Sequence, residues 1–358
     1  MVQIPRGLHN WAPMLVAALL VAVFIAACEP QRQAAIPLAT LWYPWYGFDM
    51  ETDESIGGLG SSHWNTDAGS YGSRVGVTDE PAWGFYASDD REVIARQLEA
   101  MRRASINTIL VSWWGWGDSD LDGVIDSPEG LATDRAVRAL MEYLASSGAP
   151  FKVAFMVEPF MHDANELTRD KEQKLVDYVW ENYYSQYPDL VFQWDGKPLL
   201  GTFFPLDLSG TGDSRVTFRV WGSSNAPNWK AYQPFDWNGY PDVDTLDMQI
   251  SDDGVIIVFP RFDEYWAWIM GWKPDWRPRR IDPLLQDQVY ERAWQVCVEN
   301  RGTLKLIIVY SWNEHGDHSA IEPTKEETPI AAGWTLVDKT SEYHGRFMAG
   351  KGIEVTSH

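Results

Sequence analysis

Cysteine and positive charge are both scarce in this chain of 358 residues. It has two cysteines, Cys28 and Cys297, and we expect no disulfide between them. Cys297 falls in an apolar helical stretch and is predicted to be a small buried residue. The 29 Lys and Arg are outnumbered by 51 Asp and Glu, which gives a formal net charge of −22. So acidic a surface repels nucleic acid and anionic lipid headgroups, and we expect neither as a partner.

The chain also lacks a glycine-rich phosphate loop after its first predicted strand, which argues against a nucleotide-binding fold. The apolar run Met14–Ala27 is too short to be read as a membrane span. It follows the basic Arg6 and ends in Ala26-Ala27-Cys28, as secretory signals do.

Small residues directly before a cysteine resemble the lipobox of bacterial lipoproteins. We therefore expect residues 1–27 to be a signal peptide, 28–36 a tether lipidated at Cys28, and 37–358 a single catalytic domain. The protein would be exported and anchored to a bacterial membrane, at the cell surface or in the periplasm. The alternative is an ordinary signal peptide that is cleaved nearby.

Aromatic residues are abundant: the chain has 20 Trp, and 14% of its residues are Phe, Trp or Tyr. Many of these rings are expected to fill the core. The excess indicates a carbohydrate ligand, because the C–H face of a sugar stacks on a ring that has an apolar face and a polar edge.

Strand-like and helix-like segments alternate after residue 37. Continuous apolar strands separated by helices indicate a parallel sheet, and their number favours one (β/α)8 barrel of the TIM type with long βα loops. The predicted strands are Leu38–Tyr46, Ile106–Trp113, Phe151–Val157, Pro198–Phe204, Arg215–Trp221, Val255–Phe259 and Leu304–Tyr310. The predicted helices are Arg91–Arg103, Thr133–Ser146, Lys171–Tyr187 and Leu284–Asn300.

Polar and aromatic residues follow the predicted strands directly. In a barrel these strand ends share one rim, where active sites are built. We expect a substrate site there for an oligo- or polysaccharide. Its predicted substrate-binding residues are Tyr43, Trp45, Tyr46, His63, Trp64, Trp113, Trp114, Trp116, Asn313 and His318.

Three carboxylates at this rim are candidate catalytic residues. Cleavage of a glycosidic bond needs one carboxyl group to protonate the leaving oxygen and a second to assist at the anomeric carbon. Glu314 comes shortly after the last predicted strand, Asp317 follows in the turn, and Glu158 comes directly after the third predicted strand. The alternatives are solvated loop acids for the first two and a salt bridge for Glu158. Glu322 is expected to order the loop.

These residues resemble the endo-α-mannosidase family, glycoside hydrolase family 99, and its wider relatives, from about Leu41 to Pro323. The matching segments are Trp42-Tyr43-Pro44-Trp45-Tyr46, His63-Trp64, Gly84-Phe85-Tyr86 with Ser88-Asp89, Val111-Ser112-Trp113-Trp114-Gly115, Glu158-Pro159-Phe160, Trp312-Asn313-Glu314 and Ile321-Glu322-Pro323. The resemblance implies a (β/α)8 barrel that cleaves internal α-mannosidic bonds with retention.

The resemblance also implies roles for the acids of the last strand. Glu314 would deprotonate the 2-hydroxyl of the substrate, which attacks the anomeric carbon, and Asp317 would be the general acid and base. The sequence departs from the family pattern Trp-Asn-Glu-x-x-Glu here, because Asp317 stands where the pattern has Glu and His315-Gly316 where it has Trp-His. His318 is the alternative proton donor.

A calcium loop is predicted at Asp118–Glu129. Oxygen ligands at positions 1, 3, 5, 9 and 12, glycine at position 6 and a backbone carbonyl at position 7 match the EF-hand pattern. Because the loop follows a strand, we expect one structural Ca²⁺ site, with Ile125 directed into the core. The alternative is an acidic turn without metal. The predicted ligands are Asp118, Asp120, Asp122, the carbonyl of Val124, Asp126 and Glu129.

Three functions fit these patterns. The first is a retaining endo-acting glycoside hydrolase that cleaves α-mannosidic or related α-glycan linkages. The second is a non-catalytic glycan-binding lipoprotein, which the shortened Asp317 would favour. The third is a glycan-modifying transferase on the same barrel.

Overall fold

The structure is a computed structural model, and it describes residues 36–58, 60–64, 80–160, 168–203, 205–221, 250–263, 281, 286–326 and 332–355. The predicted signal peptide and the predicted lipidation site Cys28 lie outside these residues. Within them, no helix has the length and apolar character needed to cross a membrane.

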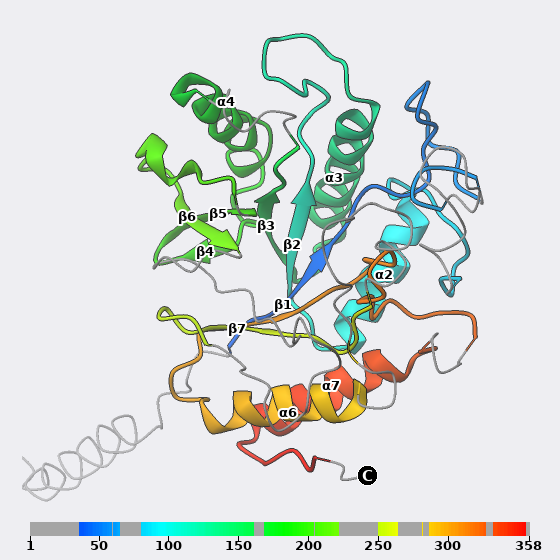
Figure 1. Ribbon diagram of the computed structural model, residues 1–358, viewed down its shortest axis with the longest axis vertical. Helices are drawn as coiled ribbons and strands as arrows, with labels where there is room; N and C mark the ends of the chain where they lie inside the picture. Colours follow the sequence, from blue (N-terminus) through cyan, green and yellow to red (C-terminus); the bar gives the residue numbers. More distant parts are fainter. Residues whose placement is uncertain are drawn as a thin grey trace, which may run out of the picture. The chain divides into compact units, whose positions relative to one another are not determined.

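One curled sheet forms the centre of the described part of the chain (Figure 1). Seven of its strands run parallel in the order β6–β5–β3–β2–β1–β8–β7. The first strand lies beside the last, as in α/β barrels. The parallel strands are β1 (Leu38–Trp42), β2 (Thr108–Trp113), β3 (Lys152–Val157), β5 (Lys197–Phe203), β6 (Thr217–Trp221), β7 (Val255–Val258) and β8 (Leu306–Val309). The two-residue strand β4 (Gln193–Trp194) pairs antiparallel with β5.

Successive residues of each strand point to opposite faces of the sheet, and both faces are buried. One set forms the inner cluster, which includes Leu41, Leu110, Met156 and Ile308. The alternate set packs with the helices in the outer cluster, which includes Trp42, Ile109, Val111, Phe155 and Val309. A residue's parity within its strand therefore decides whether it can reach the inside of the sheet.

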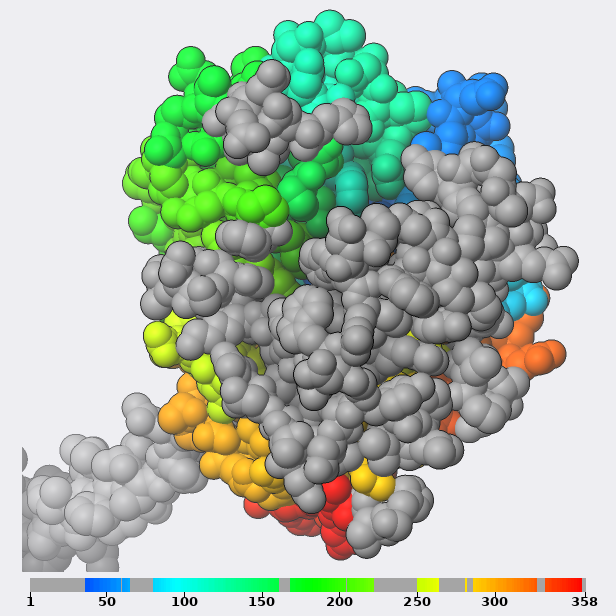
Figure 2. All heavy atoms as spheres, viewed as in Figure 1, coloured from blue at the N-terminus to red at the C-terminus, as the bar shows by residue number. Residues whose placement is uncertain are grey.

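Helices cover the outer face of the sheet (Figure 1). Asp90 caps α2 (Arg91–Arg103), Ser127 caps α3 (Pro128–Ser147) and Thr168 caps α4 (Arg169–Val179). Each side chain accepts hydrogen bonds from backbone N–H groups of the first turn of its helix. In the view of Figure 2 the segments that contain α3 (teal) and α4 (green) adjoin, and Arg138 Nη2 donates to the Tyr178 hydroxyl at 2.8 Å. The helices are α2 (Arg91–Arg103), α3 (Pro128–Ser147), α4 (Arg169–Val179), α6 (Gln286–Glu299) and α7 (Thr335–Met348).

The predicted elements agree with the structure except at several boundaries. Helix 91–103 is confirmed to the residue. The first strand ends at Trp42 rather than Tyr46, so residues 43–46 belong to the loop that follows. The helix predicted at 171–187 is α4, which begins at Arg169 and ends at Val179, followed directly by a short π-helix at Trp180–Tyr184. A 3₁₀ helix at Leu208–Thr211, after β5, was not predicted. Helix α7 was not predicted. Cys297 is fully buried in α6 as expected.

Candidate active site

The inner face of the sheet brings acids and tyrosines together where the strands end. Tyr43 continues the inward series of Ala39 and Leu41, and Tyr310 continues that of Leu306 and Ile308. Glu158 likewise follows the inward Ala154 and Met156 of β3. With the two acids of the loop after β8, these residues form what we call the inner-rim cluster: Tyr43, Glu158, Tyr310, Glu314 and Asp317.

Both acids of the loop after β8 are held by hydrogen bonds. Ser311 Oγ accepts from the Glu314 backbone N–H at 2.8 Å, and the Gly316 N–H donates to Glu314 Oε1 at 2.7 Å. Asp317 is bound at both oxygens: Oδ2 accepts from the Tyr310 hydroxyl and Oδ1 from the Ser319 N–H, each at 3.0 Å. Glu314 is 8% exposed, so its carboxyl group is desolvated yet oriented.

The electrostatics of Tyr43 indicate that the three predicted acids share one region. Burial raises its pKa well above the usual value, and the neighbouring charges of Tyr310, Glu314, Glu158 and Asp317 raise it further. The pKa of Tyr310 is also raised, first by burial and then by Asp317 and Glu314. Both hydroxyls are therefore protonated at neutral pH.

Tyr43, Tyr310 and Asp317 form a chain of hydrogen bonds. The Tyr43 hydroxyl donates to the Tyr310 hydroxyl at 3.2 Å, and Tyr310 donates to Asp317. Hydroxyl groups both donate and accept, so the direction of the chain can reverse when Asp317 gains a proton. The chain can thus satisfy the charged and the neutral form of Asp317 in turn, as a residue that alternates between acid and base requires.

Glu158 is set apart from the other acids by its protonation. Burial raises its pKa from 4.5 to about 8, against the lowering effect of a 2.7 Å hydrogen bond from Ser112 Oγ, and the charge of Glu129 adds to the rise. The same Ser112 oxygen accepts from Trp114 Nε1 at 3.2 Å. At neutral pH Glu158 is thus a neutral acid that can donate a hydrogen bond.

Aromatic rings lie beside the cluster on the side of the first two strands. Trp45 is 4.8 Å from Tyr43 between ring centroids, 5.6 Å from Trp114, and stacks on His63 at 4.4 Å. His63 Nε2 lies 3.0 Å from Glu129 Oε1. The predicted substrate-binding residues Tyr43, Trp45, His63 and Trp114 are therefore brought together.

Two predicted substrate-binding residues face the other way. Trp113 is fully buried in the outer cluster, and its Nε1 donates to Asp134 at 3.2 Å. Trp116 stacks on Tyr178 of α4 with ring centroids 4.3 Å apart. The prediction that Trp113 contacts substrate is wrong, because its parity in β2 directs its fully buried ring outward. Trp116 lies in the loop after β2, and its stacking on Trp113 and Tyr178 places its ring on the same outer side.

Three more predicted substrate-binding residues are buried and pack next to the inner-rim cluster. Asn313 is fully buried; its Oδ1 accepts from Tyr43 N–H at 2.8 Å and its Nδ2 donates to the Tyr43 carbonyl at 2.9 Å. The Tyr46 hydroxyl donates to the Asn313 carbonyl at 2.7 Å, and the buried Trp64 stacks on Tyr46. Asn313, Tyr46 and Trp64 therefore hold Tyr43 and the loop after β8 in place. His318 is almost buried in the loop after β8 and has a positive φ of 54°.

A buried carboxylate anchors the loop after β8. Glu322 is 1% exposed and accepts hydrogen bonds from His315 Nε2 at 2.9 Å and from three other side chains. It therefore orders the loop, as its position after an apolar residue predicts. The other donors are Trp83 Nε1 at 2.9 Å, the Tyr86 hydroxyl at 2.9 Å and Gln97 Nε2 at 2.6 Å.

The predicted calcium loop gathers half of its expected ligands. Carboxylate oxygens of Asp118, Asp120 and Asp122 lie within 4.8 Å of one another. Asp126 instead accepts from the N–H and hydroxyl groups of Ser119 at 2.9 and 3.0 Å, and Glu129, in the first turn of α3, lies against His63. Ile125 is 53% exposed, so the expectation that it points into the core is wrong.

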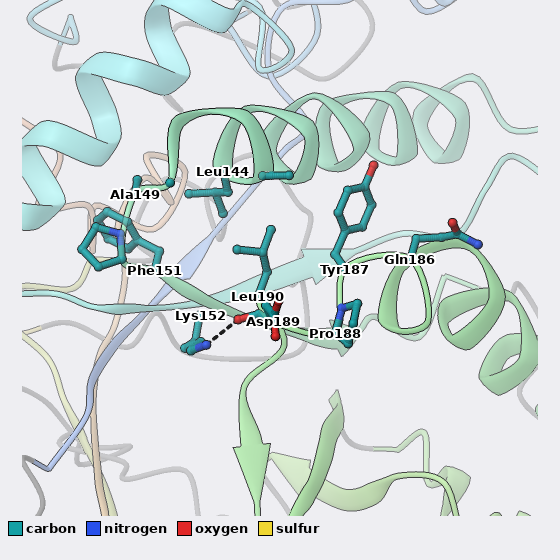
Figure 3. Close-up of a pocket in the computed structure, with 12 residues that line it drawn as sticks. Leu144, Ala149, Phe151, Lys152, Gln186, Tyr187, Pro188, Asp189 and Leu190 are labelled. Carbon is teal, nitrogen blue, oxygen red and sulfur yellow. Dashed lines mark hydrogen bonds between the residues drawn. The ribbon is translucent and has the colours of Figure 1, made fainter.

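A separate hollow of about 540 Å³ lies at the opposite end of β3 (Figure 3). It is bounded by the end of α3, the start of β3 and residues 186–190. Lys152 Nζ donates to the Asp189 carbonyl there. None of the predicted site residues lines it. The end of β3 that carries Glu158 is thus the one that gathers acids and aromatic rings.

An α/β fold whose acids gather where parallel strands end, beside aromatic rings, is typical of a carbohydrate-cleaving enzyme of the barrel class. Residues 39–207 match the sequence model described as glycosyl hydrolase family 99. In this part of its sequence the chain is therefore similar to glycoside hydrolase family 99.

Solved structures support the same fold. The GH99 endo-alpha-mannosidase from Bacteroides thetaiotaomicron, in complex with bis-tris propane, superposes with a TM-score of 0.58 at 17% identity, over 87% of this chain and 98% of that one. A second structure of that enzyme gives a TM-score of 0.58 at 16% identity, with the same coverage. A glycoside hydrolase-like protein gives 0.51 at 12% identity, over 88% and 95% of the two chains. No curated protein sequence matches.

Proposed function

We propose that this chain is a retaining endo-acting glycoside hydrolase that cleaves α-mannosidic or related α-glycan linkages. We further propose that its sheet closes as a complete (β/α)8 barrel. The family match supports glycoside hydrolase chemistry. The observation that carries the proposal is the common influence of Glu158, Glu314 and Asp317 on Tyr43, which lies beside Trp45 and Trp114.

The proposed reaction uses Glu314 and Asp317 as the carboxylate pair. Glu314 takes the proton from the 2-hydroxyl of the substrate, whose oxygen then forms a bond to the anomeric carbon. Asp317 gives its proton to the leaving glycosidic oxygen, and later takes a proton from the water that reopens the ring. As the water attacks the anomeric carbon, the bond between that carbon and the 2-oxygen breaks, and Glu314 returns its proton to the 2-oxygen. Each carboxyl group thus returns to its starting state, and two inversions leave the anomeric configuration retained.

The surroundings of both acids suit these roles. The Gly316 N–H and the low exposure of Glu314 fix one carboxylate in an orientation that a base needs. The chain from Tyr43 through Tyr310 serves either protonation state of Asp317. Glu158, neutral at pH 7, is placed as a hydrogen-bond donor to a sugar oxygen.

The test is turnover of α-mannan oligosaccharides and other α-glycans by the wild type and Glu314→Gln, with Glu142→Gln on the exposed side of α3 as control. We expect turnover to fall by at least about 1000-fold in Glu314→Gln and to be unchanged in the control. NMR of the first product should show the α-anomer. Sugar binding with no wild-type turnover would instead support a binding lipoprotein, and products formed only with an activated sugar donor a transferase.

We also propose that the loop at Asp118–Glu129 holds one structural Ca²⁺. The three converging carboxylates of Asp118, Asp120 and Asp122 support this, since calcium prefers several hard oxygen ligands. Asp122→Ala should lower the melting temperature in calcium and leave it unchanged in chelator, whereas an equal decrease in both would exclude the metal. Asp252→Ala, in the turn before β7, is the control.

The lipid anchor remains a proposal that rests on the sequence before Cys28. Cys28→Ser should release the protein from the membrane fraction into the soluble fraction. Unchanged membrane association would contradict lipidation. A detergent-extracted wild type whose mass includes acyl chains would support it directly.

A further inference from the structure

A second hollow, of about 480 Å³, lies away from the inner-rim cluster. It lies between Ala82, in the segment before α2, residues 324–325, and residues 333–338 at the start of α7. None of the residues of the inner-rim cluster lines it. Its lining residues are Ala82, Thr324, Lys325, Gly333, Trp334, Thr335 and Asp338.

Trp334 is exposed in this hollow yet held in place. It is 37% exposed and is the one aromatic residue among the large exposed apolar side chains of the described segments. The Arg103 guanidinium lies 4.7 Å from its ring centroid, and Trp83 meets it edge-on at 6.4 Å. Arg103 is itself fixed by two hydrogen bonds to Asp338, at 2.6 and 2.7 Å. The indole is therefore oriented before any ligand arrives.

The charges around the hollow are balanced. Lys325 pairs with Glu80, and Arg103 pairs with Asp338, so neither an anion nor a cation finds an uncompensated partner there. The remaining polar lining consists of threonines and backbone. A neutral ligand with many hydroxyl groups suits these surroundings.

A protein partner suits them less well. The other large exposed apolar residues of the described segments are Ile56, Val124, Ile125 and Val355, and none lines the hollow. A single aromatic ring in a polar hollow lacks the apolar core that protein interfaces bury. It does offer a flat apolar face to the C–H groups of a sugar ring, with polar groups at its margin.

We propose that the hollow around Trp334 is a glycan-binding site distinct from the inner-rim cluster. A neutral sugar unit stacks on the open part of the indole, and its hydroxyls reach the polar side chains of the lining. Such a site would hold a long polysaccharide on the protein while a different stretch of it occupies the cluster. The inference goes beyond the proposed function and does not depend on turnover.

The experiment is affinity electrophoresis of the full chain in gels that contain yeast α-mannan or, separately, soluble starch. We expect at least one of these polysaccharides to retard the wild type. Trp334→Ala should raise the apparent dissociation constant about 10-fold or more, as truncation of a central aromatic contact does. Trp334→Tyr, which keeps a flat ring, should recover most of the binding.

Trp180→Ala is the matched control, because Trp180 also lies under a guanidinium group, that of Arg215 at 5.3 Å, but lines neither hollow. It should be retarded like the wild type. The indole N–H resonance of Trp334 should shift when a short oligosaccharide of the retarding polysaccharide is added. Turnover of a short chromogenic substrate by Trp334→Ala should match the wild type.

Two results would overturn the site: no retardation of the wild type by either polysaccharide, or equal retardation of Trp334→Ala and wild type. Loss of binding in Trp334→Tyr together with a large decrease in melting temperature would assign Trp334 a purely structural role. Retardation that depends on Trp334 in a protein that hydrolyses nothing would leave this site standing and refute the proposed function alone.

Discussion

The raised pKa of Glu158 makes a specific prediction about stability. Its pKa rises from 4.5 to about 8 on folding, so the folded protein binds this proton more tightly than the unfolded chain does. The stabilisation that the proton brings is complete below pH 4.5 and is lost as the pH rises toward 8. Glu158→Gln keeps the shape and the hydrogen bond from Ser112 but cannot ionise, so it is not subject to this loss.

The size of the effect follows from the shift. About 3.5 units at 1.36 kcal/mol each gives an upper limit of about 5 kcal/mol. Glu158 is only half-buried, and local relaxation weakens the penalty, so we expect about 2–3 kcal/mol. The slope between pH 5 and 8 cannot exceed about 1.4 kcal/mol per pH unit, because a single proton is involved.

Urea unfolding of the wild type and of Glu158→Gln at one-unit intervals from pH 5 to 9 measures this difference directly. The free energy of unfolding of the variant minus that of the wild type should rise with pH and level off above about 8. Glu142→Gln, an exposed glutamate of α3, should follow the wild type throughout. A difference that stays flat, or that falls with pH, would refute the assigned protonation of Glu158.

Three further substitutions test the geometry of the loop after β8. A Cβ added in Gly316→Ala would lie 2.8 Å from Glu314 Oε1, so the carboxylate must move, and kcat should fall about 10- to 100-fold with little change in melting temperature. Tyr310→Phe removes the donor to Asp317 and should slow cleavage of natural linkages more than that of substrates with activated leaving groups; equal losses on both would exclude the proton-handling role. Glu322→Gln places an amide among four donors and should lower the free energy of unfolding by about 2–4 kcal/mol in chemical denaturation, whereas an unchanged value would contradict its anchoring role.

The fold could be predicted from the sequence further than the site could. Apolar runs and helical periods located the strands and helices, and the positions of the candidate acids just after strands predicted that they would lie together. The direction of side chains was harder, because strands buried on both faces show no alternation of polar and apolar residues. Ser112 is the one polar residue late in β2, and its bond to Glu158 marks the inward face. From the position of Ser112 alone, the sequence could have predicted that the side chain of Trp113 points outward and that of Trp114 inward.

Local signals competed in the predicted calcium loop. Ser127 followed by Pro128 marks the start of a helix, and α3 does begin there. The match to the calcium pattern treated Glu129 as a loop ligand, although it lies in the first turn of this helix. Ile125 has no second helix to pack against in a βα loop, so it remains exposed. Tyr310 and Gly316 were overlooked because each acts through a neighbour's carboxylate.

The double hydrogen bond between Tyr43 and Asn313 joins residues 270 positions apart, and β1 lies beside β8. Bringing residues so far apart in the chain together costs conformational entropy before the contacts between them can stabilise the fold, so we expect this junction to form late in folding. A ribosome must therefore release almost the whole polypeptide before its first strand can meet its last. A chain interrupted before residue 313 would lack both the partner of Tyr43 and two of the three acids of the inner-rim cluster.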